Sequence, residues 1–462
     1  MSIATSLTTK QAKGNIPLHA LSAKDYSAWL KSQPAHVKSW IKAAAFEGKT
    51  GQYIRIPAKD GAIAQIVTIL SEPVSQWDIA ALPGLLKEGR YELHSAMDES
   101  VTAKLALGWA LGCQRHTLYK KDEEPTATLC LSNKTNTKSI IETALILAQA
   151  RTLITTPAED LGPVELAEAV KNLAAKYKAT FKQIAGDQLK KQGFEATHRV
   201  GRASPRAPRL IEMNWGHKKH PKVTLIGKGV CFDTGGLDIK PSGGMYLMRK
   251  DMGGAAVALS VAAMVMSAKL PIQLQLIIPC VDNAIDGNAF RPSDIIKMPN
   301  GKTVEVGNTD AEGRLILADA LCAASKGKPD LIIDFATLTG AARSAVGTEI
   351  SAFFCDNDEL AQKLYEAGCA TEDHLWRMPL FKSYQNMLKS PFADITSCPA
   401  SPYAGAITAA LFLQEFVDKA TPWIHLDFMA WNTNAKPGRP EGGEAMAARA
   451  VTLFLEKRFT RT

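Results

Sequence analysis

The interpretation of this chain depends first on the stretch 307–320, which reads GNTDAEGRLILADA. It contains two carboxylates, Asp310 and Glu312, two positions apart, and a glycine and Arg314 follow them. Alternate residues of an extended segment point the same way, so we expect the two acids to converge just before a helix that begins at Arg314. Two like charges held close together need a cation between them or a shifted pKa. The stretch therefore predicts a site for positive charge.

A second polar stretch, 226–255, reads IGKGVCFDTGGLDIKPSGGMYLMRKDMGGA. An apolar strand pattern is followed by four charged residues, Lys228, Asp233, Lys240 and Asp251. Glycines lie among them and permit close approach of the backbone. A phosphate-binding loop is excluded because the pattern G-x4-G-K-[ST] is missing. Taken alone, each residue is explained as a charge at a strand end. Together with the two acids of the first stretch, however, Asp233 and Asp251 supply oxygen ligands suited to Mn²⁺, Mg²⁺ or Zn²⁺, and four acids are enough to bridge two ions.

The length of the chain, 462 residues, is more than one ordinary core needs and predicts two domains. Apolar residues make up 46% and charged residues 22%, which is a globular composition. After about residue 180, short apolar runs alternate with helical patterns, which predicts an α/β fold with a mixed sheet flanked by helices. We predict a small N-terminal α/β domain at 1–138 with an oligomeric or regulatory role, a linker helix segment at 139–161, and a larger catalytic α/β domain at 162–462.

Several classes of protein are disfavoured. No segment approaches eighteen uninterrupted apolar residues, so we predict no membrane span, and the N-terminus shows no secretory signal. Eight cysteines without a CxxC pair indicate reduced thiols in a cytoplasmic protein. The net charge of +8 is mild for this length. DNA binding through the first domain stays an alternative, but no basic cluster interleaved with aromatic residues favours it.

Three blocks taken together, 227–241, 248–255 and 308–315, resemble the leucyl (cytosol) aminopeptidase family. Further matches lie at 291–294, 301–306 and 336–341. The resemblance covers about residues 200–455, whereas the first 138 residues match only in length and general character. It implies a hydrolase with two divalent metal ions, Mn²⁺ or Zn²⁺ and, as a further option, Mg²⁺.

The resemblance also implies roles for particular residues. The metal ligands would be Lys228, Asp233, Asp251, Asp310 and Glu312, with Asp233 and Glu312 bridging the ions. The catalytic residues would be Lys240 and Arg314, with a bicarbonate at Arg314 as general base. The substrate-binding residues would be Met248, Asn308, Thr337, Leu338 and Gly340, although Met248 is explained nearly as well as core filling.

The implied reaction is the release of N-terminal residues, leucine and other apolar ones preferred, from peptides. A metal-activated water would attack the scissile carbonyl, and Lys240 would stabilise the oxyanion. Lys228 would have to be neutral to serve as a ligand, so the neighbouring cations would depress its pKa. The family further implies a homohexamer. Other two-metal hydrolases, such as phosphatases, are disfavoured because the ligand set includes a lysine and no histidine.

Overall fold

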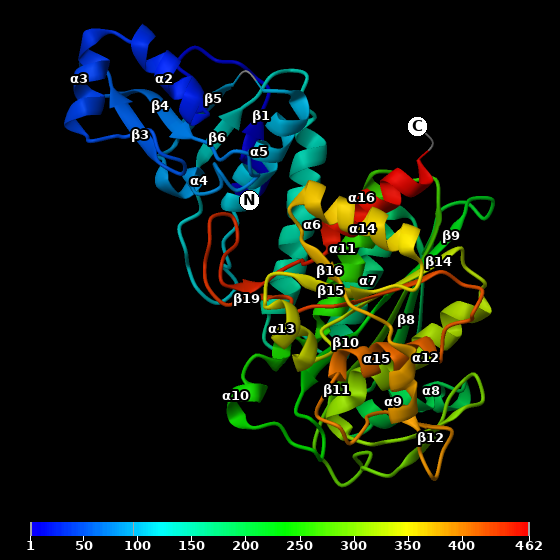
Figure 1. Cartoon of the computed structure of the whole chain (residues 1–462). Coiled ribbons are helices and arrows are strands. Elements are labelled where there is room, and N and C mark those ends of the chain that lie inside the picture. The colour runs from blue at the N-terminus through cyan, green and yellow to red at the C-terminus, as the bar shows by residue number, and fades with distance from the viewer. Residues whose placement is uncertain (1, 96, 461–462) are drawn as a thin grey trace. The chain divides into compact units, whose positions relative to one another are not determined.

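The computed structural model describes residues 2–95 and 97–460, and the chain divides into two compact units (Figure 1). The first unit comprises the chain up to Ala148 together with a returning segment, Asn434–Glu441. The second comprises Gln149–Thr433 and the residues from Gly442 onward. The division falls inside the long helix α6 (Thr137–Thr155), so this helix contributes to both units. The sequence-based boundaries at 138 and 161 stay predictions.

The first unit is built on a six-stranded sheet in the order β1-β6-β5-β2-β4-β3. Strand β3 pairs antiparallel with β4, and the remaining pairings are parallel. Its strands are β1 (Leu7–Thr8), β2 (Ile16–Leu21), β3 (Tyr53–Pro57), β4 (Ile63–Ile69), β5 (Gly89–His94) and β6 (Ala127–Cys130). Its helices, besides part of α6, are α1 (Ser2–Thr5), α2 (Ala23–Ser32), α3 (Ala35–Ala43), α4 (Leu82–Leu85) and α5 (Glu99–Gly112).

The second unit contains a nine-stranded mixed sheet in the order β16-β15-β18-β14-β9-β11-β8-β7, with β10 paired to β11. Strands β18, β14, β9, β11 and β10 pair in parallel, and antiparallel strands extend both edges. The strands are β7 (Thr180–Ala185), β8 (Arg209–Trp215), β9 (Lys222–Gly227), β10 (Gly229–Asp233), β11 (Gln273–Asn283), β14 (Leu331–Ala336), β15 (Ser351–Phe354), β16 (Leu375–Arg377) and β18 (Trp423–Asp427). A small three-stranded sheet contains β12 (Ile295–Lys297), β13 (Thr303–Glu305) and β17 (Ile395–Thr396). A two-stranded sheet contains β19 (Trp431–Asn432) and β20 (Gly442–Gly443).

Helices cover both faces of this sheet, as Figure 1 shows. One layer contains α7 (Pro163–Tyr177), α11 (Gly253–Ser267), α14 (Asp358–Thr371) and α16 (Ala448–Phe459). The other contains α9 (Glu195–Gly201), α12 (Glu312–Lys326) and α15 (Gly405–Gln414). The remaining short helices are α8 (Gln188–Lys191), α10 (Ser242–Met245), α13 (Gly340–Val346), η1 (Met248–Met252), η2 (Thr309–Ala311) and η3 (Lys382–Leu388). The predicted fold class, a small α/β domain and a larger one with a mixed sheet flanked by helices, is confirmed.

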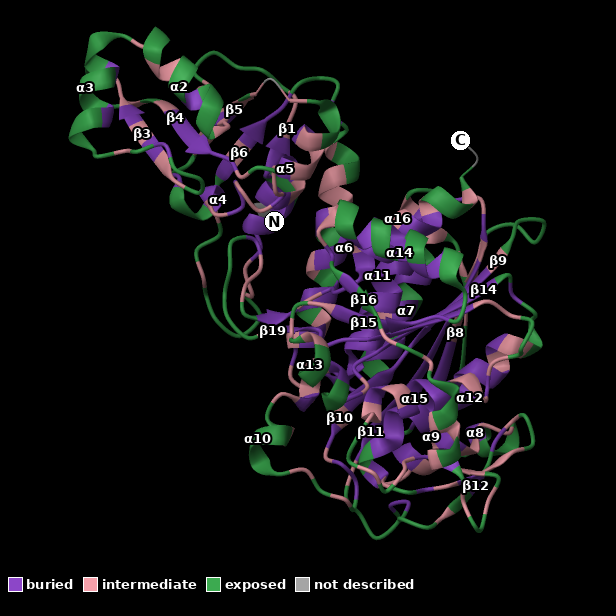
Figure 2. Ribbon diagram, viewed as in Figure 1, coloured by how far each residue is buried: buried purple, intermediate pink, exposed green. Residues whose placement is uncertain are grey.

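The core of the second unit lies between the central strands and these helices, where Figure 2 shows the ribbon almost entirely buried. All six residues of β14 are buried, which explains why the strand shows no polar alternation, and its one charged residue, Asp334, accepts a hydrogen bond from Trp423 Nε1 at 2.7 Å and pairs with His425 Nδ1 at 2.6 Å. Helix α11 touches the sheet most closely at Gly254. A Cβ there would lie 2.1 Å from the carbonyl oxygen of Phe335, so only glycine permits this approach.

The N-terminus of α7 differs from what its sequence predicts. Asp160 is the plausible N-cap from residue type, but the N-cap is Gly162. The Gly162 N–H donates to the Glu165 carboxylate at 2.9 Å, so a side chain within the first turn satisfies the backbone N–H of the cap residue itself.

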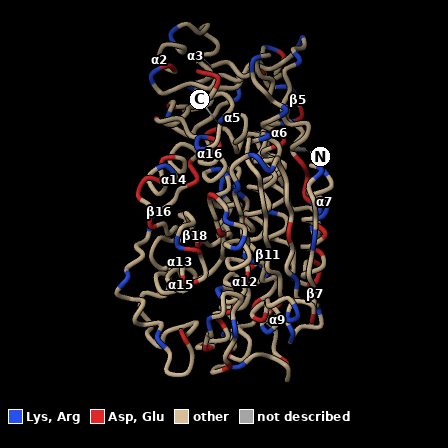
Figure 3. Tube along the Cα trace, turned by 90° about the vertical axis from the view of Figure 1, so that its right-hand side faces the viewer, with Lys and Arg blue, Asp and Glu red and all other residues tan. Residues whose placement is uncertain are grey.

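The surface agrees with the composition. In Figure 3, Lys and Arg are scattered along the trace among Asp and Glu. Among the helices of the described residues, none is long and apolar enough to cross a membrane.

Candidate active site

The candidate site lies where the parallel strands of the second unit end. Lys228 directly follows β9, Asp233 is the last residue of β10, and Thr337 directly follows β14. Asp251 belongs to the 3-10 turn η1, immediately before α11. The carboxyl ends of parallel strands meet at one edge of a sheet, so residues far apart in sequence are brought together there.

The pair Asp310 and Glu312 converges, but not for the expected reason. The segment is not extended: Asp310 lies in the 3-10 turn η2, and Glu312 is the first residue of α12. The Asn308 side chain accepts a hydrogen bond from the Asp310 N–H at 2.7 Å and so caps this turn. The alternation argument was therefore wrong, although one carboxylate oxygen each from Asp233, Asp310 and Glu312 lie within 4.8 Å of one another.

Two lysines bind these acids together. The Lys228 ammonium lies 2.6 Å from Asp251 Oδ2 and 3.1 Å from Glu312 Oε1. The Lys240 ammonium lies 2.8 Å from Asp233 Oδ2 and also pairs with Asp310. The side chain of Lys228 is 3% exposed, whereas that of Asp310 is 34% exposed, so the cluster is buried at one end and open to solvent at the other.

The electrostatics show an excess of buried negative charge. Burial, reinforced by repulsion from Asp233, raises the pKa of Glu312 to about 8 and that of Asp310 to about 6. Burial alone would lower the pKa of Lys228, but the attraction of Asp251 and Glu312 outweighs it, so the pKa of Lys228 is raised. In the protein without metal ions, both lysines are thus held in the charged form.

Arg314 lies on α12 one residue beyond Gly313 and is 7% exposed. One guanidinium N–H donates to the Ser397 carbonyl oxygen at 2.8 Å, while Nε is buried without a hydrogen-bond acceptor among the described residues. Burial lowers the pKa of Arg314 from its ordinary value, and Glu312 opposes that shift.

Among the predicted substrate-binding residues, Thr337 is joined directly to the cluster. Its hydroxyl donates to Asp251 Oδ1 at 2.9 Å, and its carbonyl oxygen accepts from Lys228 Nζ at 3.0 Å. Leu338 follows on the same loop and is partly exposed, and Gly340, the first residue of α13, is exposed. Met248 begins η1 and is 8% exposed, a burial that fits core filling as well as a pocket wall.

Residues that the sequence analysis did not assign hold these segments in place. Asp427, the last residue of β18, accepts hydrogen bonds from the backbone N–H groups of Leu338 and Thr339 at 2.9 and 3.1 Å. Asp238, an acid to which the resemblance gives no role as a ligand, accepts from the Thr309 N–H at 2.7 Å. Only the position of Asp427 at the end of an apolar strand pattern could have indicated such a role.

The arrangement fits a divalent metal ion. The donor atoms are hard carboxylate oxygens, which Mn²⁺, Mg²⁺ and Zn²⁺ accept. Glu312 Oε2 is buried and has no hydrogen-bond partner in the part of the chain that the structure describes. A buried carboxylate oxygen left without a partner is costly, and a cation would relieve both this cost and the repulsion among the acids.

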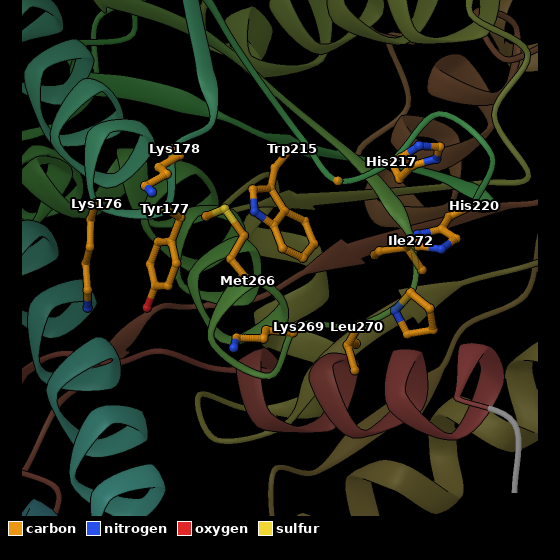
Figure 4. Close-up of a pocket in the computed structure, with 12 residues that line it drawn as sticks. Lys176, Tyr177, Lys178, Trp215, His217, His220, Met266, Lys269, Leu270 and Ile272 are labelled. Carbon is orange, nitrogen blue, oxygen red and sulfur yellow. The ribbon is translucent and has the colours of Figure 1, made fainter.

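A hollow of about 520 Å³ lies elsewhere in the second unit (Figure 4). Its walls include Trp215 at the end of β8 and Ile272 just before β11, with Lys176, Lys178 and Lys269 around them. This is the edge of the sheet where β9 and β11 begin, whereas the acid cluster lies where they end. The hollow contains none of the predicted site residues and is not the candidate active site.

Comparison with known proteins agrees with this geometry. The family model described as the cytosol aminopeptidase family, catalytic domain, matches residues 148–454, and the M17 aminopeptidase N-terminal domain matches residues 16–132. A probable cytosol aminopeptidase of Persephonella marina is 37% identical over 371 residues, which cover 78% of this chain and 75% of the relative. A relative of the same description from Xylella fastidiosa is 37% identical and covers 88% of this chain and 81% of its own length.

Solved structures agree over the whole chain. The crystal structure of a cytosol aminopeptidase from Coxiella burnetii matches with a TM-score of 0.94 and 46% identity, covering 98% of this chain and 99% of that one. The bottromycin maturation enzyme BotP, in complex with Mn, matches with a TM-score of 0.86 and 29% identity, covering 96% of this chain and 99% of that one. The chain therefore belongs to the cytosol aminopeptidase family and is a metal-dependent aminopeptidase.

Proposed function

We propose that the acid cluster holds two divalent metal ions, with Lys228, Asp233, Asp251, Asp310 and Glu312 as their ligands. The observation that carries this proposal is the convergence of carboxylate oxygens of Asp233, Asp310 and Glu312 within 4.8 Å, together with the unpaired oxygen of Glu312. When bound, the ions would lower the pKa of a water molecule toward neutrality and polarise the scissile carbonyl. Because BotP is described in complex with Mn, Mn²⁺ is the first ion to test.

The chain's own residues supply the remaining chemistry. Lys240 is charged, and its side chain is 14% exposed at the open end of the cluster, where it could donate to an oxyanion. A donor of this kind is worth ~2.7–4 kcal/mol of transition-state stabilisation. Lys228 must give up a proton before its amine can serve as a ligand, so metal loading releases a proton from Nζ.

Arg314 is the proposed seat of a bicarbonate ion that serves as general base. The guanidinium presents N–H donors in a planar fork that matches a planar oxyanion, and its Nε–H has no protein acceptor among residues 2–95 and 97–460. No protein side chain at the site is an evident substitute for this base.

The proposed substrates are peptides with a free amino terminus, leucine and other apolar residues preferred. Met248, Asn308, Thr337, Leu338 and Gly340 would line the cleft. We further propose that the chain forms a homohexamer and works in the cytoplasm. Light scattering would test the first point: six chains of 49.9 kDa each are expected in one particle.

The experiment that tests the function is hydrolysis of leucine p-nitroanilide by the full chain. The rate is measured as purified, after chelation, and after addition of Mn²⁺, Zn²⁺ or Mg²⁺, beside an Asp310→Ala variant and an N-acetylated substrate. We expect activity that is lost on chelation, returns with metal, and is absent for both the variant and the blocked substrate. Hydrolysis of the blocked substrate at an equal rate would contradict an aminopeptidase.

A further inference from the structure

Asn283, the last residue of β11, lies beside Asp233 because strand β10 is irregular. Val230 pairs with Val281, and the same offset would place Asp233 opposite Ala284. The register shifts just after Val230, and Asp233 pairs with Asn283 instead. A shift of one residue changes both the neighbour and the face that a side chain meets. The bulge therefore brings this amide to the acid cluster.

The Asn283 amide connects two segments that carry acids of the site. Its Nδ2 donates to Asp233 Oδ1 at 2.8 Å and to the carbonyl oxygen of Thr309 at 3.1 Å, and the residue is 1% exposed. Both partners are acceptors, so the atom that faces them must be the amide nitrogen. Each of its two amide protons is thus used, one in a hydrogen bond to β10 and one in a hydrogen bond to η2, the turn that contains Asp310.

These hydrogen bonds fix the rotation of the Asp233 carboxylate. Oδ1 accepts from Asn283 and from the Gly235 N–H at 2.9 Å, while Oδ2 lies on the side of Lys240 at 2.8 Å. A neutral amide is suited to this place because it donates without changing the charge of the cluster. An acid there would add negative charge to a site where burial and repulsion already raise the pKa of two carboxyl groups.

We propose that Asn283 is a positioning residue of the metal centre: it holds the Asp233 carboxylate and the Asp310 turn in the arrangement that binds the ions. The inference rests on the proposed function, because it presumes that the cluster binds metal. Groups that orient metal ligands in this way typically change metal affinity or activity by about 10- to 100-fold when they are removed.

The test measures Mn²⁺ affinity by isothermal titration of the chelator-treated full chain. Asn283→Leu keeps the number and branching of the side-chain heavy atoms and removes both donors, and Asn283→Ala, which cannot overpack the site, is the second variant. The matched control is Thr224→Val, which removes a buried hydrogen bond between β9 and β11, from Thr224 Oγ1 to Gln275 Oε1 at 3.0 Å, near the opposite end of β11 from Asn283. We expect the Kd for Mn²⁺ to rise about 10- to 100-fold in the Asn283 variants and to stay at the wild-type value in the control.

A second readout separates positioning from a general loss of structure. Hydrolysis by the Asn283 variants should recover as Mn²⁺ is raised. Because an ion that binds the folded state can also rescue a folding defect, circular dichroism of the metal-free variants must first show that they are folded before the ion is added. Wild-type Mn²⁺ affinity in both Asn283 variants would overturn the proposal whatever their activity, as would failure of both to fold where Thr224→Val folds. If the wild-type chain itself bound no Mn²⁺ or other divalent ion, the proposed function would fail instead.

Discussion

Gly313 packs so closely against Lys228 that we expect any side chain at this position to displace the lysine. A Cβ added at Gly313 would lie 2.3 Å from Lys228 Cε and 2.8 Å from Nζ. Ordinary carbon–carbon contacts begin near 3.5 Å, so the lysine would have to move by roughly 1 Å. Its ammonium has hydrogen-bond distances of 2.6 Å to Asp251 and 3.0 Å to the Thr337 carbonyl, and such a shift would stretch or break them.

We therefore expect Gly313→Ala to lower kcat/KM by about 100-fold, the loss that a misplacement of about 1 Å produces. Stability should change little, because alanine favours the helix by ~1 kcal/mol while overpacking costs ~1–3 kcal/mol. The assay is leucine p-nitroanilide hydrolysis, with metal content measured on the same sample. Gly287→Ala is the control, since a Cβ there meets no atom within 4 Å. Wild-type kcat/KM and metal content in Gly313→Ala would refute the argument.

Three further predictions concern charge. Lys240→Met should lower kcat by about 10²–10³-fold with metal content retained, because an oxyanion donor is lost; equal kcat would contradict its role. Arg151→Met should lower the free energy of unfolding in urea by ~3–5 kcal/mol, because Arg151 holds the buried Glu444 carboxylate at 2.9 and 3.0 Å. Burial raises the pKa of the Asp319 carboxyl group from 3.8 to about 7. The free energy of unfolding therefore falls as the pH rises from about 4 to about 7, and above pH 7 the whole cost of the buried charge is present. Asp319→Asn keeps an acceptor for Thr197 and cannot ionise, so its free energy of unfolding relative to wild type should rise by on the order of 4 kcal/mol between pH 4 and pH 7. Curves of unfolding free energy against pH that run parallel for the two proteins would contradict this.

The buried strands of the second unit are the ones that the sequence predicts well. It predicts strands at 223–226, 274–278, 331–335, 351–354 and 423–428, which are mostly apolar and contain only buried polar residues such as Asp334 and His425. Strand β7 was missed because it is half-exposed at the edge of its sheet and carries charged and polar residues. Strand β2 was missed although it is central, because it contains Pro17, which argues against a central strand.

The site residues that lie in short polar motifs could be predicted from the sequence. Those whose place depends on the pairing of distant strands were missed. Asp310 and Glu312 are recognisable from their spacing alone, even though a helical turn and not an extended segment brings them together. Asn283 carries no local signal, because its place beside Asp233 follows from strand pairing and from a one-residue bulge. Asp427 likewise acts on a loop that lies 88 residues away in the chain.

The central claim is that the carboxylate cluster binds the divalent ions on which hydrolysis depends. Its most direct test is equilibrium dialysis of chelator-treated protein against Mn²⁺, for the wild type and for Glu312→Gln, with hydrolysis of leucine p-nitroanilide followed on the same samples. The account predicts two ions bound per wild-type chain, activity that rises with their binding, and loss of both in the variant. Full hydrolysis by metal-free wild type, or unchanged Mn²⁺ binding by Glu312→Gln, would contradict it.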